Sequence, residues 1–171
     1  LLNVCAVDEL FKVEPVTGQV LRNDKFEDSD YKNGNLFWDG KNKATTLTGA
    51  KGEFVCFQLI LENISGKPID SISFKTDGLT LDKNSIPANN IRFLREWYLK
   101  KDANWYSNAL PILEDKANGV LQLPYTDNVI EGQKFLALYV EIYVPNQSVA
   151  GKYIGSIKIT ADKKEIAVPI Q

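Results

Sequence analysis

The chain has 171 residues, of which 44% are hydrophobic and 25% are charged, and its formal net charge is -2. This length suits one domain that buries a substantial core, and the near-neutral charge excludes the electrostatic footprint of a nucleic-acid or anionic-membrane binding protein. No apolar run approaches the ~20 residues that span a bilayer. Histidine is absent, which excludes Ser-His and Cys-His catalytic arrangements and histidine metal ligands.

The start of the chain, residues 1–7, predicts a strand that ends at Asp8-Glu9. Methionine is absent, position 1 included, so we expect a processed or trimmed chain. Cys5 in this strand has Cys56, in a second strand-like segment, as its one partner cysteine. The two thiols form a disulfide if their strands are neighbours in register, and otherwise act as small apolar side chains. Two cysteines in a chain of this size leave both outcomes open.

The segments that follow are polar and loop-like. Residues 12–21 are extended, and residues 23–35, rich in Asp, Asn and Lys, predict a long loop. This loop contains three acidic residues close together, Glu27, Asp28 and Asp30. Clustered carboxylate oxygens of this kind can bind Ca²⁺. The glycine that an EF-hand needs to turn its chain is missing from this spacing. We therefore predict a polar loop, with no metal site and no cofactor.

The strongest strand of the first half spans residues 53–62, after a shorter strand start at 44–47. Both of its faces are mostly apolar, so we expect a central strand that is covered on both sides. Gln58 is the polar residue in its middle. An unsatisfied buried amide costs ~1–3 kcal/mol, and we therefore predict a hydrogen bond from this side chain to a loop backbone.

The middle of the chain alternates between strands and loops. We expect a short strand at 69–74, a loop at 76–90 and a strand at 91–100. Residues 102–129 read as one long irregular segment, part of which we expect to lie against a neighbouring domain. Aromatic residues in irregular segments stack on sugars, dock to a neighbouring domain or fill the core. The candidates for carbohydrate or domain-interface contact are Trp38, Trp105, Tyr106 and Tyr125.

The end of the chain reads as three strands joined by two turns, in the segments 135–145, 150–159 and 165–171. Side chains alternate across a strand, so Val140 belongs to the predicted core and Glu141 faces away from it. No segment has the apolar stripe of an amphipathic helix. The predicted fold class is all-β: one antiparallel β-sandwich of immunoglobulin-like or jelly-roll-like architecture, a single domain over residues 1–171.

Four segments, taken in order, resemble a known domain: residues 7–13, 47–61, 105–111 and 139–155. They are similar to the N-terminal β-sandwich of family-123-type glycoside hydrolases, and the resemblance covers nearly the whole chain. It implies a C-terminal (β/α)8 barrel of the same polypeptide, which carries the catalytic acids and hydrolyses a glycoside with help from the N-acetyl group of the substrate. Asn108 stands where this family is expected to have Asp, so no charged role is carried over for that loop.

The resemblance therefore implies a non-catalytic accessory domain that supports and orients the barrel, in a bacterial protein that is secreted, periplasmic or on the cell surface. No catalytic residue is predicted in this chain. Asp8-Glu9 is an adjacent acid pair, as the catalytic dyad of the family is. A glycosidase, however, needs carboxylates that flank the sugar, one of them with a raised pKa. These two acids end a strand in the wrong domain, and a solvated strand end is the better interpretation.

Two other functional classes stay open from the sequence. One is an independent carbohydrate-binding module, with carbohydrate as its partner. The other is a cell-surface adhesion or assembly domain, because a sandwich fold by itself does not determine a function. An exposed aromatic strip on one sheet would favour the binding module. An apolar patch near Gln171 would favour the accessory domain and its partner barrel.

Overall fold

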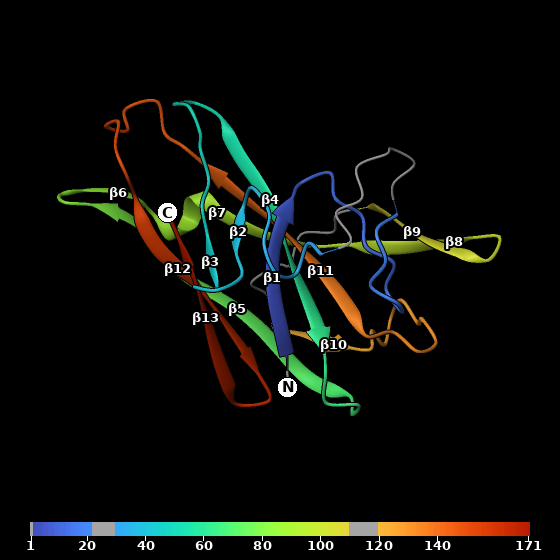
Figure 1. The fold of residues 1–171 in the computed structure, drawn as a ribbon. Coiled ribbons are helices and arrows are strands. Elements are labelled where there is room, and N and C mark those ends of the chain that lie inside the picture. The colour runs from blue at the N-terminus through green and yellow to red at the C-terminus, as the bar shows by residue number, and fades with distance from the viewer. Residues whose placement is uncertain (1, 22–29, 110–119) are drawn as a thin grey trace.

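The computed structural model describes residues 2–21, 30–109 and 120–171, and these residues form an all-β fold. Two large sheets stack against each other and enclose the hydrophobic core (Figure 1). The only helical piece among the described residues is a short 3-10 turn at Ala88–Asn90. The all-β sandwich predicted from the sequence is confirmed.

The first sheet consists of four antiparallel strands in the order β1-β4-β11-β7. As predicted, β4 is central and lies between two neighbours. Part of the outward face of this sheet is covered by the segment that follows β1. In that segment Gly18 lies so close to the Phe135 ring that a Cβ atom would come within 2.4 Å of it. The strands are β1 (Leu2–Asp8), β4 (Phe54–Asn63), β7 (Ile91–Arg95) and β11 (Phe135–Tyr143).

The second sheet follows the order β10-β5-β12-β13-β3-β2, with β6 added beside β5. Its pairings are antiparallel except for β13 with β3, which run parallel with Ile170 opposite Thr45. The strands are β2 (Trp38–Asp39), β3 (Ala44–Thr45), β5 (Ile69–Leu81), β6 (Asn84–Ile86), β10 (Val120–Leu123), β12 (Ile154–Ala161) and β13 (Lys164–Ile170).

The core lies between the inward faces of the two sheets. Val140 is buried in it, whereas Glu141 faces away and forms an ion pair with Arg92 of β7. The predicted register of β11 is therefore confirmed, and a slip by one residue would have exchanged the two faces. Phe74 of the second sheet meets Phe93 of the first, with ring centroids 5.9 Å apart. Other buried residues of the core are Leu59, Leu61, Leu136, Leu138, Ile142, Ile157, Ile159 and Val168.

The loop predicted at residues 76–90 is wrong, because β5 continues to Leu81 and pairs with β6. Gly78 has a φ of +90° and sits where the register between β5 and β12 shifts. A glycine with positive φ permits a bulge that interrupts the pairing without ending the strand. The Thr76 hydroxyl supports the bulge, since it donates to the carbonyl of Ser156 and accepts from the Gly78 amide.

The strand predicted at 91–100 and the irregular segment predicted at 102–129 are also corrected. The first is two strands, β7 in the sandwich and β8 (Trp97–Lys101) in a separate hairpin with β9 (Asn104–Ala109). Asp102 closes the hairpin with a φ of +57°, a left-handed conformation that Asp tolerates better than most residues. β10 then adds to the edge of β5. Part of the segment, residues 110–119, lies outside the described residues.

Both cysteines are free thiols. Their strands β1 and β4 are neighbours, but Cys5 is opposite Ile60 rather than Cys56. A shift of four residues along a strand is about 13 Å, well beyond the Cα separation that a disulfide can bridge. The alternative of thiols acting as small apolar side chains therefore applies.

Gln58 makes the predicted backbone hydrogen bonds. Its Nε2 atom donates to the carbonyls of Glu9 and Phe11, each at 2.7 Å. Both acceptors lie in the turn that follows β1, so this buried amide fixes that turn to the central strand of the first sheet.

Candidate functional site

Two of the four aromatic candidates, Trp38 and Tyr125, are core residues. Trp38 is 2% exposed, and its indole nitrogen donates to the carbonyl of Lys32 at 3.1 Å. Tyr125 is 3% exposed, and its hydroxyl donates to the carbonyl of Glu96 at 3.3 Å. A ring enclosed in this way offers no face to a sugar or to another domain, so the surface role predicted for these two residues is corrected to core packing.

The other two candidates, Trp105 and Tyr106, lie on the β8–β9 hairpin. Figure 1 shows this hairpin projecting from the sandwich on the side away from the C-terminus. Tyr106 is 43% exposed and lies opposite Leu99, which is 48% exposed. Trp105 is half-buried and lies opposite Lys100, whose Nζ atom is 5.7 Å from the ring centroid. One face of the hairpin is therefore apolar and exposed, and its role as a contact surface stays a prediction.

Charge and hydrogen bonds hold the base of the hairpin rigidly on the sandwich. Arg95 lies between the rings of Trp97 and Tyr125, at 4.8 and 5.1 Å from their centroids. Its guanidinium donates to both carboxylate oxygens of Asp127, which lowers the pKa of that carboxyl group. The Asn128 side chain accepts from the backbone amide of Tyr98 in β8 at 2.8 Å and donates to the Tyr98 carbonyl at 2.9 Å. These contacts fix the direction in which the hairpin projects.

The outward face of the first sheet carries an aromatic and charged strip that the sequence analysis did not single out. Phe54 and Tyr143 are opposite each other on β4 and β11, with ring centroids 5.1 Å apart. Arg92 lies over the Phe54 ring at 5.5 Å and pairs with Glu141. Tyr139, on the same face of β11, donates its hydroxyl to Glu9 at 3.4 Å.

A groove opens at the end of the sandwich where β13 finishes. It has a volume of about 780 Å³, and its walls are two loops, residues 46–51 and 148–153, together with strand ends from both sheets. Figure 1 shows these loops rising together beyond the sheets near the C-terminus. The lining is mainly apolar; it includes Leu47, Val55, Leu79, Ile142, Val144 and Val149, with Ile170 and Gln171 at the end of the chain.

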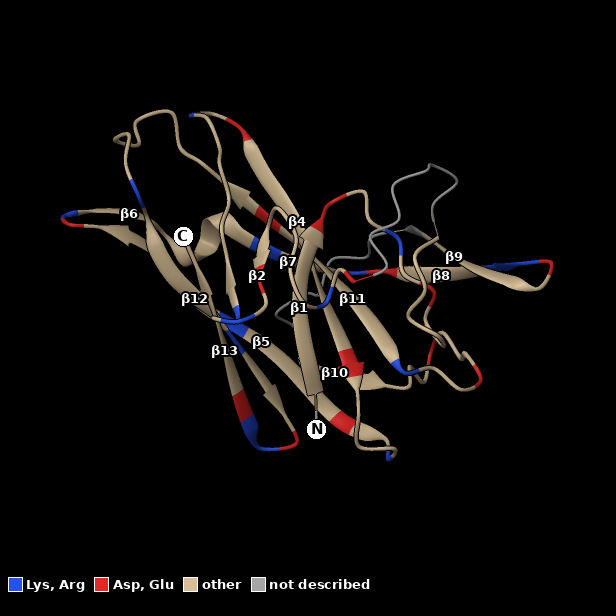
Figure 2. Ribbon diagram, viewed as in Figure 1, with Lys and Arg blue, Asp and Glu red and all other residues tan. Residues whose placement is uncertain are grey.

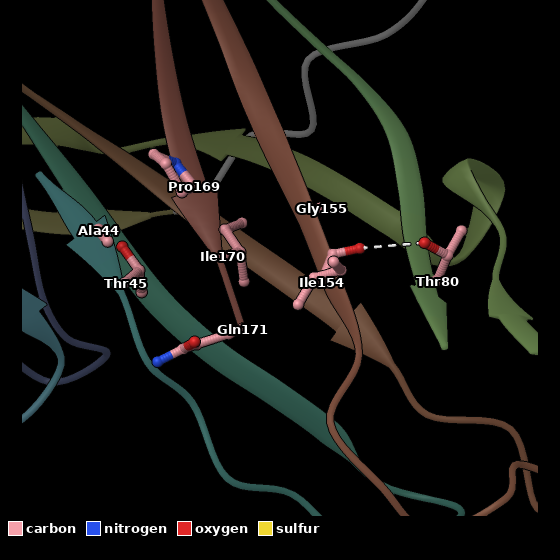
Figure 3. Close-up of a pocket in the computed structure, with 8 residues that line it drawn as sticks. All are labelled: Ala44, Thr45, Thr80, Ile154, Gly155, Pro169, Ile170 and Gln171. Carbon is pink, nitrogen blue, oxygen red and sulfur yellow. Dashed lines mark hydrogen bonds between the residues drawn. The ribbon is translucent and has the colours of Figure 1, made fainter. Parts of the chain in front are cut away.

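A second pocket of about 420 Å³ adjoins the groove and shares Ile170 and Gln171 with it (Figure 3). It lies where β3, β13 and β12 meet. The Gln171 backbone is fixed here, because its amide donates to the Thr45 carbonyl at 3.0 Å and its carbonyl accepts from the Leu47 amide at 2.9 Å. Groove and pocket together form the surface that we call the end groove.

Local structure accounts for the described acidic residues that were considered as catalytic or metal-binding groups. Asp8 accepts the Leu10 amide at 2.8 Å, as a residue at a strand end does. Asp30 accepts the side-chain amide of Asn33, whereas Glu27 and Asp28 lie outside the described residues. No group of three or more His, Cys, Asp or Glu residues in the part of the chain that the structure describes is placed to hold a metal ion.

The sequence from residue 27 to residue 161 matches the family model described as the glycoside hydrolase 123 N-terminal domain. The chain belongs to this family. Its fold is also similar to that of a family 123 glycoside hydrolase from Clostridium perfringens, the subject of a structural study of glycolipid glycan hydrolysis, with a TM-score of 0.63 and 16% sequence identity. The match covers 99% of this chain and 27% of the solved one. No curated protein matches the sequence.

In this glycoside hydrolase 123 N-terminal domain, the aromatic strip and the end groove could not be predicted from the sequence, for two different reasons. The aromatic strip uses the outward positions of β4 and β11, which alternation identifies as facing away from the core but does not place beside one another. The end groove needs the pairing of β13 with β3, two segments more than a hundred residues apart. No helix among the described residues is long and apolar enough to cross a membrane.

Proposed function

We propose that this chain is the non-catalytic N-terminal domain of a secreted bacterial glycoside hydrolase, and that it supports and orients a C-terminal catalytic barrel of the same polypeptide. The coverage of the structural match carries the proposal, since 99% of this chain corresponds to only 27% of the Clostridium perfringens enzyme. A domain of this share leaves room in such an enzyme for a separate catalytic domain.

The described carboxyl groups support a non-catalytic role. Burial raises the pKa of Glu96, which is the kind of shift that a general acid needs. Yet Glu96 is 1% exposed and is held by Lys12 at 2.9 Å, so no substrate reaches it. A glycosidase needs two carboxylates on opposite sides of a bound sugar, and neither Glu96 nor the Asp8-Glu9 strand end provides such a site.

The test compares the full-length protein with the 171-residue chain in an assay with an aryl N-acetylhexosaminide. We expect turnover by the full-length protein and none by the shorter chain. Removal of residues 1–171 from the full-length protein should lower the thermal stability or the activity of the remainder. Turnover by the isolated chain that disappears in Asp8→Asn or Glu9→Gln would refute the non-catalytic role.

The proposal also places the protein outside the cytoplasm, where a hydrolase of external glycans meets its substrate. Cell fractionation should find it in the periplasm, on the cell surface or in the medium. A pool confined to the cytoplasm would contradict this part of the proposal.

Carbohydrate binding is a second candidate function, and the outward strip on the first sheet favours it. Tyr139 and Tyr143 lie four residues apart on one face of β11, about 13 Å along the strand. The Arg92–Glu141 pair lies between them and supplies donors and acceptors suited to sugar hydroxyls. Titration calorimetry with oligosaccharides of N-acetylhexosamine should then show binding that Tyr143→Ala removes. Equal heats for the two proteins would exclude this face as the binding site.

A further inference from the structure

The end groove is a large and mainly apolar concavity of about 780 Å³, and the sandwich leaves it open. Val149 at its rim is 51% exposed. Ile154, which lines the adjoining pocket, is also an exposed large apolar residue. Contiguous apolar surface of this kind on a soluble domain is typical of a contact site rather than of a free surface.

Two buried hydroxyl groups at this end have no hydrogen-bond partner. Ser148, a groove residue, is 8% exposed, and its Oγ atom is unpaired. Thr45, in the adjoining pocket of Figure 3, is completely buried, and its Oγ1 atom is unpaired as well. Buried polar groups in folded proteins are nearly always paired, so an unpaired one requires an explanation. For Ser148, which lies in one of the two loops, a polar group of a partner that closes the groove would provide it. The enclosed Thr45 hydroxyl is out of reach of a partner, and unpaired atoms also occur away from the groove, at Gln58 and Ser107.

The charges at the rim point to the character of that partner. Lys51 and Lys152 line the groove, one from each loop, and no Asp or Glu is among its lining residues in the described chain. Figure 2 shows basic ribbon on both loops, and acidic ribbon where the first of them leads into β4. A partner surface that combines carboxylate groups with an apolar segment would complement this end of the domain.

We propose that the end groove is the seat of the catalytic domain of the same polypeptide, which inserts an apolar segment between the two loops and places carboxylates near Lys51 and Lys152. This inference rests on the proposed function. Gln171, fixed by backbone hydrogen bonds to β3, is part of the groove lining. The family model describes an N-terminal domain. A catalytic domain that follows such a domain in the chain would be tethered near this end of the sandwich, and a short tether would give it a high effective concentration at the groove.

The β8–β9 hairpin is the competing seat, because it also exposes apolar side chains. It projects on the side away from Gln171 (Figure 1). β8 ends with Lys100 and Lys101 just before the Asp102 turn, and Figure 2 shows basic and acidic ribbon at this tip. The hairpin therefore supplies an internal control of similar charge in every experiment on the full-length protein.

The first experiment is zero-length carbodiimide cross-linking of the full-length protein, followed by peptide mass spectrometry. We expect cross-links from Lys51 or Lys152 to carboxylates of the catalytic domain, and none from Lys100 or Lys101. Cross-links to the catalytic domain that come only from the hairpin lysines would overturn the groove as the seat while leaving the proposed function intact.

The second experiment uses a matched pair of exposed valines in the full-length protein. Val149→Glu places a charge at the groove rim, whereas Val129→Glu places one at a residue that is 72% exposed and does not line the groove. We expect Val149→Glu to speed proteolytic cleavage between the domains about tenfold or more, because a domain contact whose equilibrium constant falls tenfold is open about ten times as often. Val129→Glu should cleave at the wild-type rate.

The possible outcomes distinguish the docking of the catalytic domain in the groove from the accessory role itself. Equal cleavage rates for both valine variants, together with a single unfolding transition of the full-length protein, would refute the groove but not the accessory role. Two independent transitions, and a catalytic domain that is stable and fully active without residues 1–171, would refute the accessory role itself.

Discussion

Glu96 is a buried carboxyl group whose ionisation opposes folding. It lies between β7 and β8, where its backbone amide donates to Ala137 of β11 at 3.0 Å. Burial raises the pKa of its carboxyl group above the ordinary 4.5, and the nearby Lys12 offsets only part of this shift. The folded protein therefore holds the Glu96 proton more tightly than the unfolded chain does. The contribution of Glu96 to stability is fully present below pH 4.5 and is lost as the pH rises through the folded pKa.

This sign predicts the behaviour of Glu96→Gln, which keeps the shape of the side chain and removes its charge. The free energy of unfolding of the variant, minus that of the wild type, should rise as the pH increases from 4.5 towards neutrality. Urea unfolding at a series of pH values measures this difference. A difference that falls with pH would show that the ion pair with Lys12 outweighs the burial of the carboxylate.

The two thiols should differ in reactivity. Burial raises the pKa of Cys5 to about 12, so its reactive thiolate is scarce at neutral pH. Cys56 lies on the outward face of β4 and is only half-buried. Its partial burial also raises the pKa of its thiol. We expect a maleimide to modify Cys56 first in the native protein, and Cys5 only after denaturation. Faster labelling of Cys5, or a non-reducing mass two hydrogens below the reduced one, would contradict the arrangement of β1 and β4.

Strands whose pattern is uninterrupted could be predicted from the sequence, and interrupted strands could not. β11 alternates without a break, and both its existence and its register followed from that alternation. β5 contains Gly78, which reads locally as a turn residue and becomes part of the strand only because β12 pairs across the bulge. β9 follows an Asp102 turn that sequence patterns do not distinguish from an irregular loop.

The same limit applies to the candidate surfaces. Trp38 and Trp105 both lie in segments that looked irregular, and the sequence gives no reason to separate them. The structure separates them by long-range packing: Trp38 on β2 is enclosed, whereas Trp105 projects on a hairpin held by Asn128 and Arg95. A tryptophan in a loop-like segment is therefore a candidate for a surface role only until its tertiary neighbours are known.

The two tryptophans predict a contrast in stability. Trp38→Ala should destabilise the domain by ~3–5 kcal/mol, as the loss of a large enclosed side chain does. Trp105→Ala should cost on the order of 1 kcal/mol, because the half-buried ring leaves a smaller cavity. Chemical denaturation of the two variants measures both values. Equal losses would mean that the hairpin packs as tightly as the core.

At the scale of the whole molecule, one core connects both sheets and leaves the candidate surfaces at the edges. The inward residues of β4 and β11 pack on those of β12 and β13 in one cluster of buried side chains. Such a core has no internal boundary at which one sheet could unfold without exposing the other. The end groove opens at one end of this core and shares Leu79, Ile142 and Ile170 with it. The exposed side chains of the hairpin and of the outward strip lie outside the core, where a family can change contacts without changing the fold.

A single shared core predicts a single cooperative transition, and Val140→Asp tests it most sharply. Val140 lies on the inward face of β11 and is completely buried, so an aspartate here would place an unpaired carboxylate between the sheets. The loss should be several kcal/mol and should lower the midpoint of every probe together. Far-UV circular dichroism reports all strands, whereas tryptophan fluorescence reports Trp38 on the second sheet together with Trp97 and Trp105 on the hairpin. Glu141→Gln, one residue away on the outward face, serves as the control and should shift the midpoint little. Circular dichroism and fluorescence curves that separate in the wild type or in Val140→Asp would show that the two sheets unfold as independent units.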